Sequence, residues 1–264
     1  MPDKVGTIKN SSAFRRKEVY SILHNMDTIN PNNNASDTRT CEGITKPEEA
    51  SGIRNFRQGD KMNEKSCKSK EIKALVAIGV STGGPKALQE VIKFIPQNIP
   101  AAILIVQHMP TGFTKTLAER LNAISSICVK EAEDGEIVQP GHAYIAPGDY
   151  HMKVVMTKDK SLKIKLSKEP PIGGLRPSVN VMMNSVAETR FPKVIGVIMT
   201  GMGSDGSEGI VNIKQYNNGI IIAQDEETSV VYGMPRAAVK TGCVDLVVPL
   251  NDISKQIVKY VGVE

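Results

Sequence analysis

Several features that mark other protein classes are missing from this 264-residue sequence. It contains no tryptophan, and aromatic residues make up only 4% of the chain. The net charge of +5 is spread along the chain, without the block of lysine and arginine interleaved with aromatics that is typical of nucleic-acid-binding proteins. We therefore expect no nucleic-acid partner.

Signals for membrane insertion, secretion and disulfide formation are also missing. No apolar run approaches the roughly 18 residues that span a bilayer, and the first residues, MPDKVGTIKNSS, lack the apolar core of a signal peptide. We expect a cytoplasmic protein with reduced thiols, no metal site and no direct membrane insertion. The cysteines are far apart, and none lies in a CxxC pair or near a histidine at metal-ligand spacing: Cys41, Cys67, Cys128 and Cys243.

The first 70 residues differ in composition from the rest of the chain. They are rich in asparagine, lysine, serine and acidic residues, and have almost no adjacent apolar residues. Such a segment buries too little apolar surface to offset the chain entropy that folding removes. We predict a disordered tail or linker over residues 1–70, with one short amphipathic stretch at Val19–Met26, and a folded domain over residues 71–264.

From Ile72 onward, apolar runs of strand length alternate with segments of helical period, as in βαβ units around a parallel sheet. The helix after the first run begins near Pro85 and has apolar residues at helical spacing from Leu88 to Ile95. Five runs are apolar nearly throughout, as strands buried on both faces are: Ala74–Gly79, Ala102–Gln107, Val194–Met199, Ile220–Gln224 and Val244–Pro249.

Residues 142–167 follow a different pattern. Two turn signals, at Pro147 to Asp149 and at Lys158 to Ser161, separate short runs, and apolar residues alternate with lysines from Leu162 to Leu166. This pattern predicts an antiparallel meander. Together, the elements predict an α/β domain with a doubly wound, mostly parallel, Rossmann-like sheet and an inserted antiparallel β-meander.

A short motif follows the first predicted strand. Gly79, Ser81 and Gly83 fit the pattern G-x-S-x-G, in which small residues flank a serine on a sharp turn between a strand and a helix. The start of the next helix directs free N–H groups and a partial positive charge toward Ser81, which suits half of an oxyanion hole. Gly-rich loops also bind phosphate or nucleotide, although Ser81 replaces the second glycine of the dinucleotide pattern G-x-G-x-x-G. The motif alone leaves both interpretations open.

A nucleophilic serine needs a base within hydrogen-bond reach. His108 directly follows the second predicted strand, in ILIVQHMP. Adjacent parallel strands joined by one helix end side by side, so we expect Ser81 and His108 on one rim of the sheet. By position alone, a histidine that caps a strand end is the simpler interpretation. We rank the other histidines lower because His24 lies in the polar segment, and His142 and His151 flank a turn of the meander.

An orienting carboxylate is expected from a third strand end on the same rim. Asp205 follows an apolar strand in VIGVIMTGMGSDG, while Asp149 in a turn and Asp225 after the next strand are competitors. An aspartate beside glycine is usually a turn residue or a helix cap. What favours Asp205 is the combination, since three strand ends followed by irregular loops carry Ser, His and Asp in that order. This order differs from that of the α/β-hydrolases and of the two best-known serine protease folds, and so points to another scaffold.

Several blocks of the sequence resemble the catalytic domain of the bacterial chemotaxis receptor methylesterases, the CheB family. The resemblance extends from about Ile72 to Val258 and follows the order of the family's blocks. They are AIGVSTGGPKAL, IVQHMPTGFTKTLAERL, GHAYIAPGDYHM, LRPSVNVMMNSVAE, GVIMTGMGSDGSEG and AQDEETSVVYGMPRAAVKTGCVDLVVPL.

The resemblance implies an enzyme that hydrolyses glutamate γ-methyl esters on the cytoplasmic part of chemoreceptors and releases methanol. Many members also deamidate receptor glutamines, and none of this chemistry requires a metal or cofactor. The family's nucleophile, base and acid match Ser81, His108 and Asp205, the residues already selected from the strand ends. The resemblance further implies that three residues line the active site or its oxyanion hole: Thr82, Gly83 and Met202.

The sequence departs from the family in two places. Members usually carry an N-terminal receiver domain, and residues 1–70 are too few and too polar for that five-stranded fold, so we expect no phosphorylation control within this chain. Asn180 stands where the family is expected to have aspartate, outside the triad. Two alternatives stay open: a hydrolase of the same fold with another ester or amide substrate, and a nucleotide-binding regulatory module that uses the loop at Gly83.

Overall fold

The computed structural model describes residues 71–263, which hold the predicted folded domain. Residues 1–70 lie outside the described part, so the tail or linker predicted there stays a prediction. Among the described residues, no helix combines the length and the apolarity needed to cross a membrane.

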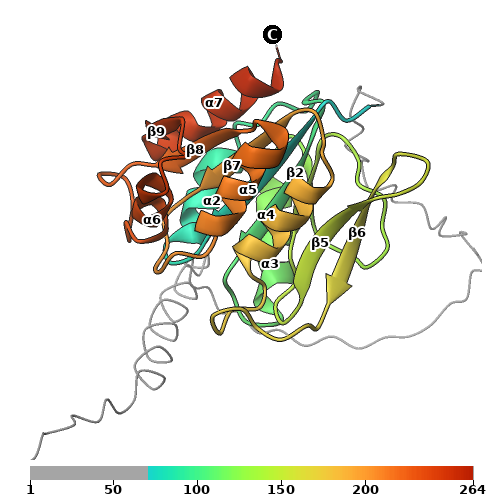
Figure 1. Ribbon diagram of the computed structural model, residues 1–264, viewed down its shortest axis with the longest axis horizontal. Coiled ribbons are helices and arrows are strands. Elements are labelled where there is room, and N and C mark those ends of the chain that lie inside the picture. The colour runs from blue at the N-terminus through green and yellow to red at the C-terminus, as the bar shows by residue number, and fades with distance from the viewer. Residues whose placement is uncertain (1–70, 264) are drawn as a thin grey trace, which may run out of the picture. The chain divides into compact units, whose positions relative to one another are not determined.

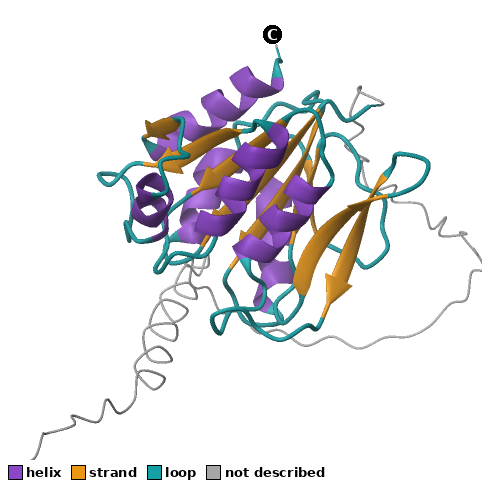
Figure 2. Ribbon diagram, in the orientation of Figure 1, coloured by secondary structure: helices purple, strands orange, loops and turns teal. Residues whose placement is uncertain are grey.

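The centre of the domain is a seven-stranded sheet (Figure 2) in which every neighbouring pair of strands is parallel. The strand order is β3-β4-β2-β1-β7-β8-β9, so the first strand lies in the middle and the chain winds outward to both sides. The strands are β1 (Ala74–Val80), β2 (Ala101–Gln107), β3 (Cys128–Glu131), β4 (His142–Ile145), β7 (Val194–Ile198), β8 (Ile220–Gln224) and β9 (Leu246–Val248).

Helices cover both faces of this sheet (Figure 1), which confirms the doubly wound α/β class. One face carries α2 (Gly84–Ile92), α3 (Phe113–Ile124) and α7 (Leu250–Val261). The other face carries α4 (Val179–Glu188), α5 (Ser207–Asn217) and α6 (Met234–Lys240).

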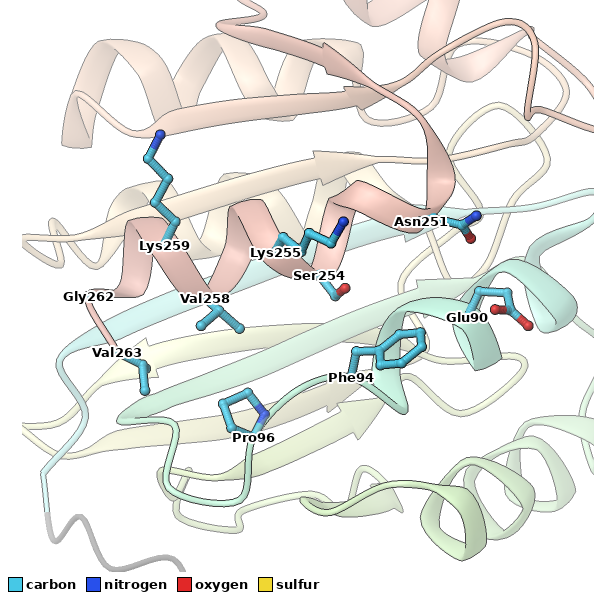
Figure 3. A pocket seen from close by; sticks show the side chains of 10 residues that line it. All are labelled: Glu90, Phe94, Pro96, Asn251, Ser254, Lys255, Val258, Lys259, Gly262 and Val263. Carbon is cyan, nitrogen blue, oxygen red and sulfur yellow. The ribbon is translucent and has the colours of Figure 1, made fainter.

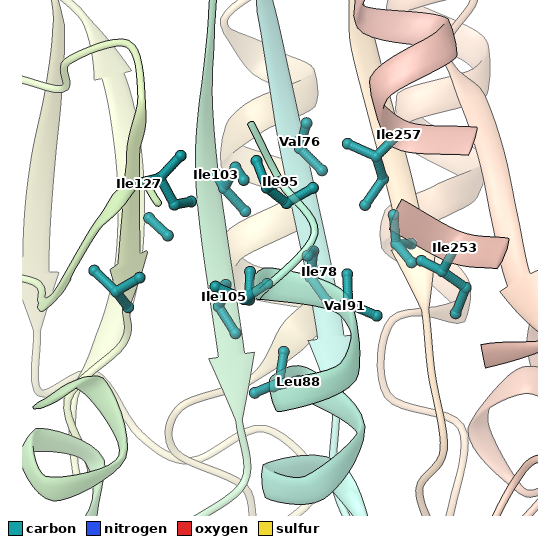
Figure 4. Close-up of a cluster of buried hydrophobic side chains, with 14 of the residues drawn as sticks. Val76, Ile78, Leu88, Val91, Ile95, Ile103, Ile105, Ile127, Ile253 and Ile257 are labelled. Carbon is teal, nitrogen blue, oxygen red and sulfur yellow. The ribbon is translucent and has the colours of Figure 1, made fainter. Parts of the chain in front are cut away.

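The core is divided between the two faces by the alternation of side chains along each strand. In β1, Val76 and Ile78 join the cluster under α2 and α7, shown in Figure 4, while Leu75 and Ala77 join the cluster under α4 and α5. Because both faces are covered, every residue of β1 and β2 is buried, as the apolar runs predicted. Each fully buried leucine, isoleucine or valine contributes about 1.5–3 kcal/mol, which makes the sheet a rigid support for the loops at its edges.

The predicted meander is smaller than the sequence suggested. Within residues 71–263, β5 (His151–Met156) and β6 (Leu162–Ser167) pair antiparallel as a separate hairpin, to which Ile137 adds an isolated antiparallel bridge at Lys163. The first segment of the expected meander is β4, which pairs in parallel with β2 and β3 and belongs to the main sheet. Turn signals do not show whether a strand pairs parallel or antiparallel, because a strand of four residues has the same local sequence pattern in both kinds of pairing. The half-buried edge strand β3 was not predicted, since CVKE has no apolar run.

Candidate active site

Three loops that carry the predicted serine, histidine and aspartate meet at one edge of the sheet. Ser81 directly follows β1 and His108 directly follows β2, while Asp205 lies in the loop after β7. Strands β2 and β7 both pair in parallel with β1, one on each side, so the carboxyl ends of the three strands are neighbours. Open α/β sheets bind ligands outside this edge, where the connections diverge to either side.

The backbone of Ser81 is held by the loops on both sides of it. Its N–H donates to the carbonyl of Thr200 at 3.0 Å, and its carbonyl accepts from the side chain of Gln107 at 3.0 Å. The carbonyl also accepts from the N–H of Gly84 at 2.8 Å, which closes the turn into α2. Gly83, the N-cap of α2, has a φ of 81°, a conformation that favours glycine. The predicted sharp turn between strand and helix is therefore present.

The loop that carries Asp205 packs directly against Ser81. A Cβ atom added to Gly201 would lie 2.8 Å from the Cβ of Ser81 and 2.4 Å from the sulfur of Met234, closer than real atoms approach. Glycine is required at this position because any larger residue would separate the two loops. The motif GMGSDG thus has a steric role at Gly201.

His108 and Asp205 are in direct contact. Nε2 of His108 lies 2.8 Å from Oδ2 of Asp205, and the two side chains are only 9% and 6% exposed. The contact joins residues 97 positions apart. Because the pair is largely shielded from water, the carboxylate can hold the imidazole in one orientation and stabilise its cationic form.

The beginning of α4 supplies the other partners of Asp205. The backbone N–H of Val179 donates to Oδ2 at 2.6 Å, that of Asn180 donates to Oδ1 at 2.9 Å, and the hydroxyl of Ser178 donates to Oδ1 at 2.9 Å. Burial alone would raise the pKa of Asp205, but hydrogen bonds from His108, Asn180 and Val179 more than offset it and hold the pKa below its ordinary value of 3.8. Asp205 is therefore ionised at neutral pH.

The ionised carboxylate determines the tautomer of His108. An ionised carboxylate only accepts hydrogen bonds, so the proton of the neutral ring is assigned to Nε2 and the lone pair to Nδ1. Nδ1 is thus the nitrogen that can take a proton from a nucleophile. Within residues 71–263 no hydrogen bond joins the Ser81 hydroxyl to this ring, and contacts of this kind in enzymes often tighten only when substrate is bound.

Asn180, at the start of α4, binds the start of α5. Its Oδ1 accepts hydrogen bonds from the backbone N–H groups of Gly206 and Gly209, both at 2.9 Å, at the start of α5. Asp205 binds the N-terminus of α4 and Asn180 that of α5, so the two helix starts hold each other in place. The aspartate expected at position 180 would serve equally as an acceptor, which explains why an asparagine is compatible with this arrangement.

Replacing Asn180 with alanine is expected to lower the free energy of unfolding by about 1–2 kcal/mol, because two N–H groups at the start of α5 lose their acceptor. Asn180→Asp keeps an acceptor and adds a negative charge at a helix N-terminus, so we expect it to retain most of the stability. Urea unfolding of both variants tests this. A loss in Asn180→Asp as large as in Asn180→Ala contradicts the capping role.

The other candidate residues have partners away from Ser81. His151 is fully buried, donates from Nε2 to the carbonyl of Pro170 at 3.2 Å, and accepts at Nδ1 from the N–H of Ser178 at 3.3 Å. Asp149 forms an ion pair with Arg176, whose guanidinium lowers the pKa of that exposed carboxyl, and Asp225 accepts from the N–H and hydroxyl of Thr228. His142 is the first residue of β4, at the end of the strand opposite to the candidate site, and its ring contacts the carbonyl of Pro140. His24 lies outside the described residues.

Sequence reasoning missed Ser178 and the capping role of Asn180. A serine directly before a helix is a common N-cap signal, and both residues stand in RPSVNV, where such a signal was available. The signal at Ser178 does not reveal the arrangement, because the N–H groups at the start of α4 are capped by Asp205, a residue far away in the chain. His151 supports the same turn through Ser178, although its position in a predicted turn carried no such indication.

Of the residues expected to line the site, Thr82 and Gly83 directly follow Ser81 in the chain, and Met202 lies on the loop after β7. The carbonyl of Thr82 accepts from the hydroxyl of Thr200 at 2.9 Å, which ties this loop to the one after β7. The side chain of Met202 is 66% exposed on the loop that carries Asp205. Among the described residues, no group of three or more His, Cys, Asp and Glu side chains is arranged to hold a metal ion.

A cavity of about 1050 Å³ lies elsewhere. It is an open groove between the end of α2 and α7, and Figure 3 shows Phe94 and Pro96 on one side and Val258 and Lys255 on the other. None of its lining residues belongs to the loops of Ser81, His108 or Asp205. This groove is therefore separate from the candidate site, which is defined by the clustered polar groups at the edge of the sheet.

Comparison with known proteins agrees with this geometry. The model of the family described as CheB methylesterase matches residues 76–257. The chain belongs to this family. The CheB match includes the ends of β1, β2 and β7, and with them Ser81, His108 and Asp205. It confirms the resemblance identified in the sequence.

Relatives in this family are similar over the same part of the chain. A protein of Pyrococcus horikoshii named protein-glutamate methylesterase/protein-glutamine glutaminase is 51% identical over 188 residues, 71% of this chain and 50% of that protein. A Geobacillus kaustophilus protein of the same name is 50% identical over 189 residues, 72% of this chain and 54% of that protein. The chain thus spans about half the length of the curated relatives it matches.

A solved CheB structure has the same fold. The crystal structure of the Thermotoga maritima CheB methylesterase catalytic domain matches with a TM-score of 0.68 and 45% sequence identity. The match covers 71% of this chain and 97% of the Thermotoga chain. The mostly parallel sheet and the small antiparallel hairpin are therefore features of the CheB catalytic domain.

Proposed function

We propose that this chain hydrolyses glutamate γ-methyl esters in the cytoplasmic domains of chemoreceptors and releases methanol, through Ser81, His108 and Asp205. The observation that carries the proposal is the shielded hydrogen bond of 2.8 Å between His108 and Asp205, one strand away from a serine on a sharp turn. The names of the relatives support the reaction class. The proposed substrate places the reaction in the cytoplasm.

The first half of the mechanism forms an acyl-enzyme. The Ser81 hydroxyl attacks the ester carbonyl while Nδ1 of His108 takes its proton, giving a tetrahedral intermediate with a negatively charged oxygen. The loops at Thr82, Gly83 and Met202 surround this oxygen and supply N–H groups to it. The intermediate collapses when its carbon–oxygen bond to methoxide breaks, and the protonated His108 transfers its proton to the departing oxygen, so that methanol leaves.

The second half returns the enzyme to its starting state. His108 takes a proton from water, the hydroxide attacks the acyl-enzyme, and the Ser81 oxygen leaves and recovers its proton from His108. The product is the γ-carboxylic acid of glutamate, which releases its proton to solvent and becomes the carboxylate. In both halves Asp205 stays ionised and stabilises the imidazolium. The same steps applied to a glutamine side chain release ammonia, which supports deamidation as a second activity of the same three residues.

The proposal is tested by methanol release from a chemoreceptor cytoplasmic fragment that carries methyl-labelled glutamate esters. We expect labelled methanol in proportion to the enzyme added, and no requirement for a metal or cofactor. A nucleotide-binding module predicts the opposite result, with no methanol and a melting temperature that rises on addition of ATP. Hydrolysis of small methyl esters without hydrolysis of the receptor fragment indicates a hydrolase with a different substrate.

A further inference from the structure

A second hollow of about 520 Å³ lies beside the proposed nucleophile. It is formed by the loop that carries Asp205, by the segment before α6, and by one side of α6 itself. Its lining residues are Met202, Gly203, Glu226, Val231, Tyr232, Gly233, Arg236, Ala237 and Lys240. None of them takes part in the proposed proton transfers, although the loop at Met202 also contributes to the proposed oxyanion hole.

Gly201 connects this hollow to Ser81. Its N–H donates to the carbonyl of Val231 at 3.0 Å, and its carbonyl accepts from the N–H groups of Gly233 at 3.1 Å and Met234 at 2.8 Å. On its other side, Gly201 packs against Ser81 so closely that no side chain fits between them. Gly201 thus lies between Ser81 and residues that line the hollow.

The rim between Ser81 and the hollow exposes apolar side chains. Met202 is 66% exposed and Val230 is 68% exposed, the highest values among the large hydrophobic residues exposed in residues 71–263. Val230 also packs against the turn at Gly83, because a Cβ atom at Gly83 would lie 2.7 Å from it. Solvent-exposed apolar side chains beside a reactive serine indicate a surface that a partner covers.

The hollow also carries unpaired positive charge. Arg236 and Lys240 are exposed and lie one turn apart on α6, and within the described residues neither has an ion-pair or hydrogen-bond partner. Among the described residues, Glu226 is the single acidic side chain that lines the hollow. Several other lysines and arginines in this part of the chain do have carboxylate partners, including Lys93, Lys214 and Arg176.

We propose that Arg236 and Lys240 determine specificity by binding carboxylates that flank the methyl ester in an acidic, helical substrate segment. The inference rests on the proposed function and names the substrate class of the same site. A glutamate methyl ester is itself neutral, so it offers no charge by which a cation could recognise it. Two cations at positions i and i+4 have Cβ atoms about 5–6 Å apart, the same separation as two carboxylates one turn apart on a substrate helix. Met202 and Val230 then contact the apolar side chains of that helix.

Two matched peptides test this proposal. Both are helical and carry one glutamate γ-methyl ester, followed on the same helix face by two residues one turn apart, which are glutamates in the first peptide and glutamines in the second. We expect the wild-type protein to prefer the acidic peptide. In the double variant Arg236→Gln/Lys240→Gln, the ratio of kcat/KM for the acidic over the neutral peptide should fall about three- to tenfold. The change should arise from KM of the acidic peptide, and the salt dependence of its KM should weaken.

The control is Arg120→Gln on α3, an exposed arginine that does not line the hollow. It should keep the wild-type preference for the acidic peptide. The proposal is overturned when the double variant keeps the full preference, or when it loses activity equally on both peptides. Binding of fluorescent forms of the two peptides to Ser81→Ala protein, with and without the double change, answers the same question when no peptide is hydrolysed. If the wild-type protein hydrolyses neither peptide but binding still depends on the charge of the peptide, the proposed function is refuted and this inference is retained.

Discussion

Replacing Ser81 with alanine is expected to lower kcat for methanol release by at least about a thousandfold, because the variant lacks the oxygen that forms the acyl-enzyme. A residual rate from the remaining oxyanion donors and from substrate binding is still expected above that of water. The measurement is labelled methanol released from the methylated receptor fragment. Release at the wild-type rate by Ser81→Ala would refute the proposed mechanism.

The same change should leave the fold intact. The hydrogen bonds that hold Ser81 all involve its backbone: its N–H donates to the carbonyl of Thr200, and its carbonyl accepts from Gln107 and Gly84. Alanine retains all of them. The Cβ atom that packs against Gly201 is also retained. We therefore expect a melting temperature close to that of the wild type. Ser126→Ala, at an exposed position between α3 and β3 whose hydroxyl has no hydrogen-bond partner among the described residues, is the matched control that should keep both stability and activity.

Replacing Asp205 with asparagine is expected to lower kcat by about a thousandfold or more, although the shape of the side chain is preserved. Both carboxylate oxygens accept from backbone N–H groups, Oδ2 from Val179 and Oδ1 from Asn180. Whichever way the amide is oriented, its NH₂ group faces one of these donors. With NH₂ toward His108, it donates to Nε2 and moves the ring proton to Nδ1, where it blocks transfer from Ser81.

Asp205→Asn should also be less stable than the wild type at neutral pH, by an amount that shrinks in acid. The pKa of Asp205 is lower in the folded protein than its ordinary value of 3.8, so its carboxylate stabilises the fold fully above that value. This stabilisation is lost as the pH falls through 3.8 toward the lower folded pKa. Urea unfolding between pH 7 and pH 3 measures the difference between the two proteins.

Two results would contradict this account of Asp205. One is an unfolding difference that stays constant from pH 7 to pH 3, because it would show that the ionised state contributes nothing. The other is an asparagine variant with normal turnover, because the tautomer argument then fails. Ser178→Ala offers a graded comparison, since it removes one of the four hydrogen bonds to Asp205 and leaves His108 in place.

The positions of the strand ends were the part of the site that local sequence could predict. Apolar runs that are buried on both faces stand out in any sequence, and the residue after each run lies at the edge of the sheet. This reasoning selected Ser81, His108 and Asp205, and the structure joins the last two by a hydrogen bond. Their catalytic roles stay predictions, as does the assignment of residues 1–70.

Local sequence patterns did not predict short or half-buried elements. Strand β3 is an edge strand of four residues with mixed polarity, and β4 could be assigned to the main sheet only through its pairing with β2. Pairing partners are chosen by contacts between distant parts of the chain. The same limit explains why the capping residues Ser178 and Asn180 were missed.

The sequence by itself determined the alternation of strands and helices, the burial of the central strands and the family of the chain, because these depend on residue type and local spacing. The tertiary structure decided which nitrogen of His108 faces Asp205, how the start of α4 holds that carboxylate, and that two cations of α6 line a hollow near the loop of Asp205. These facts depend on distances between segments far apart in the chain. Only the packing of helices on both faces of one sheet sets those distances.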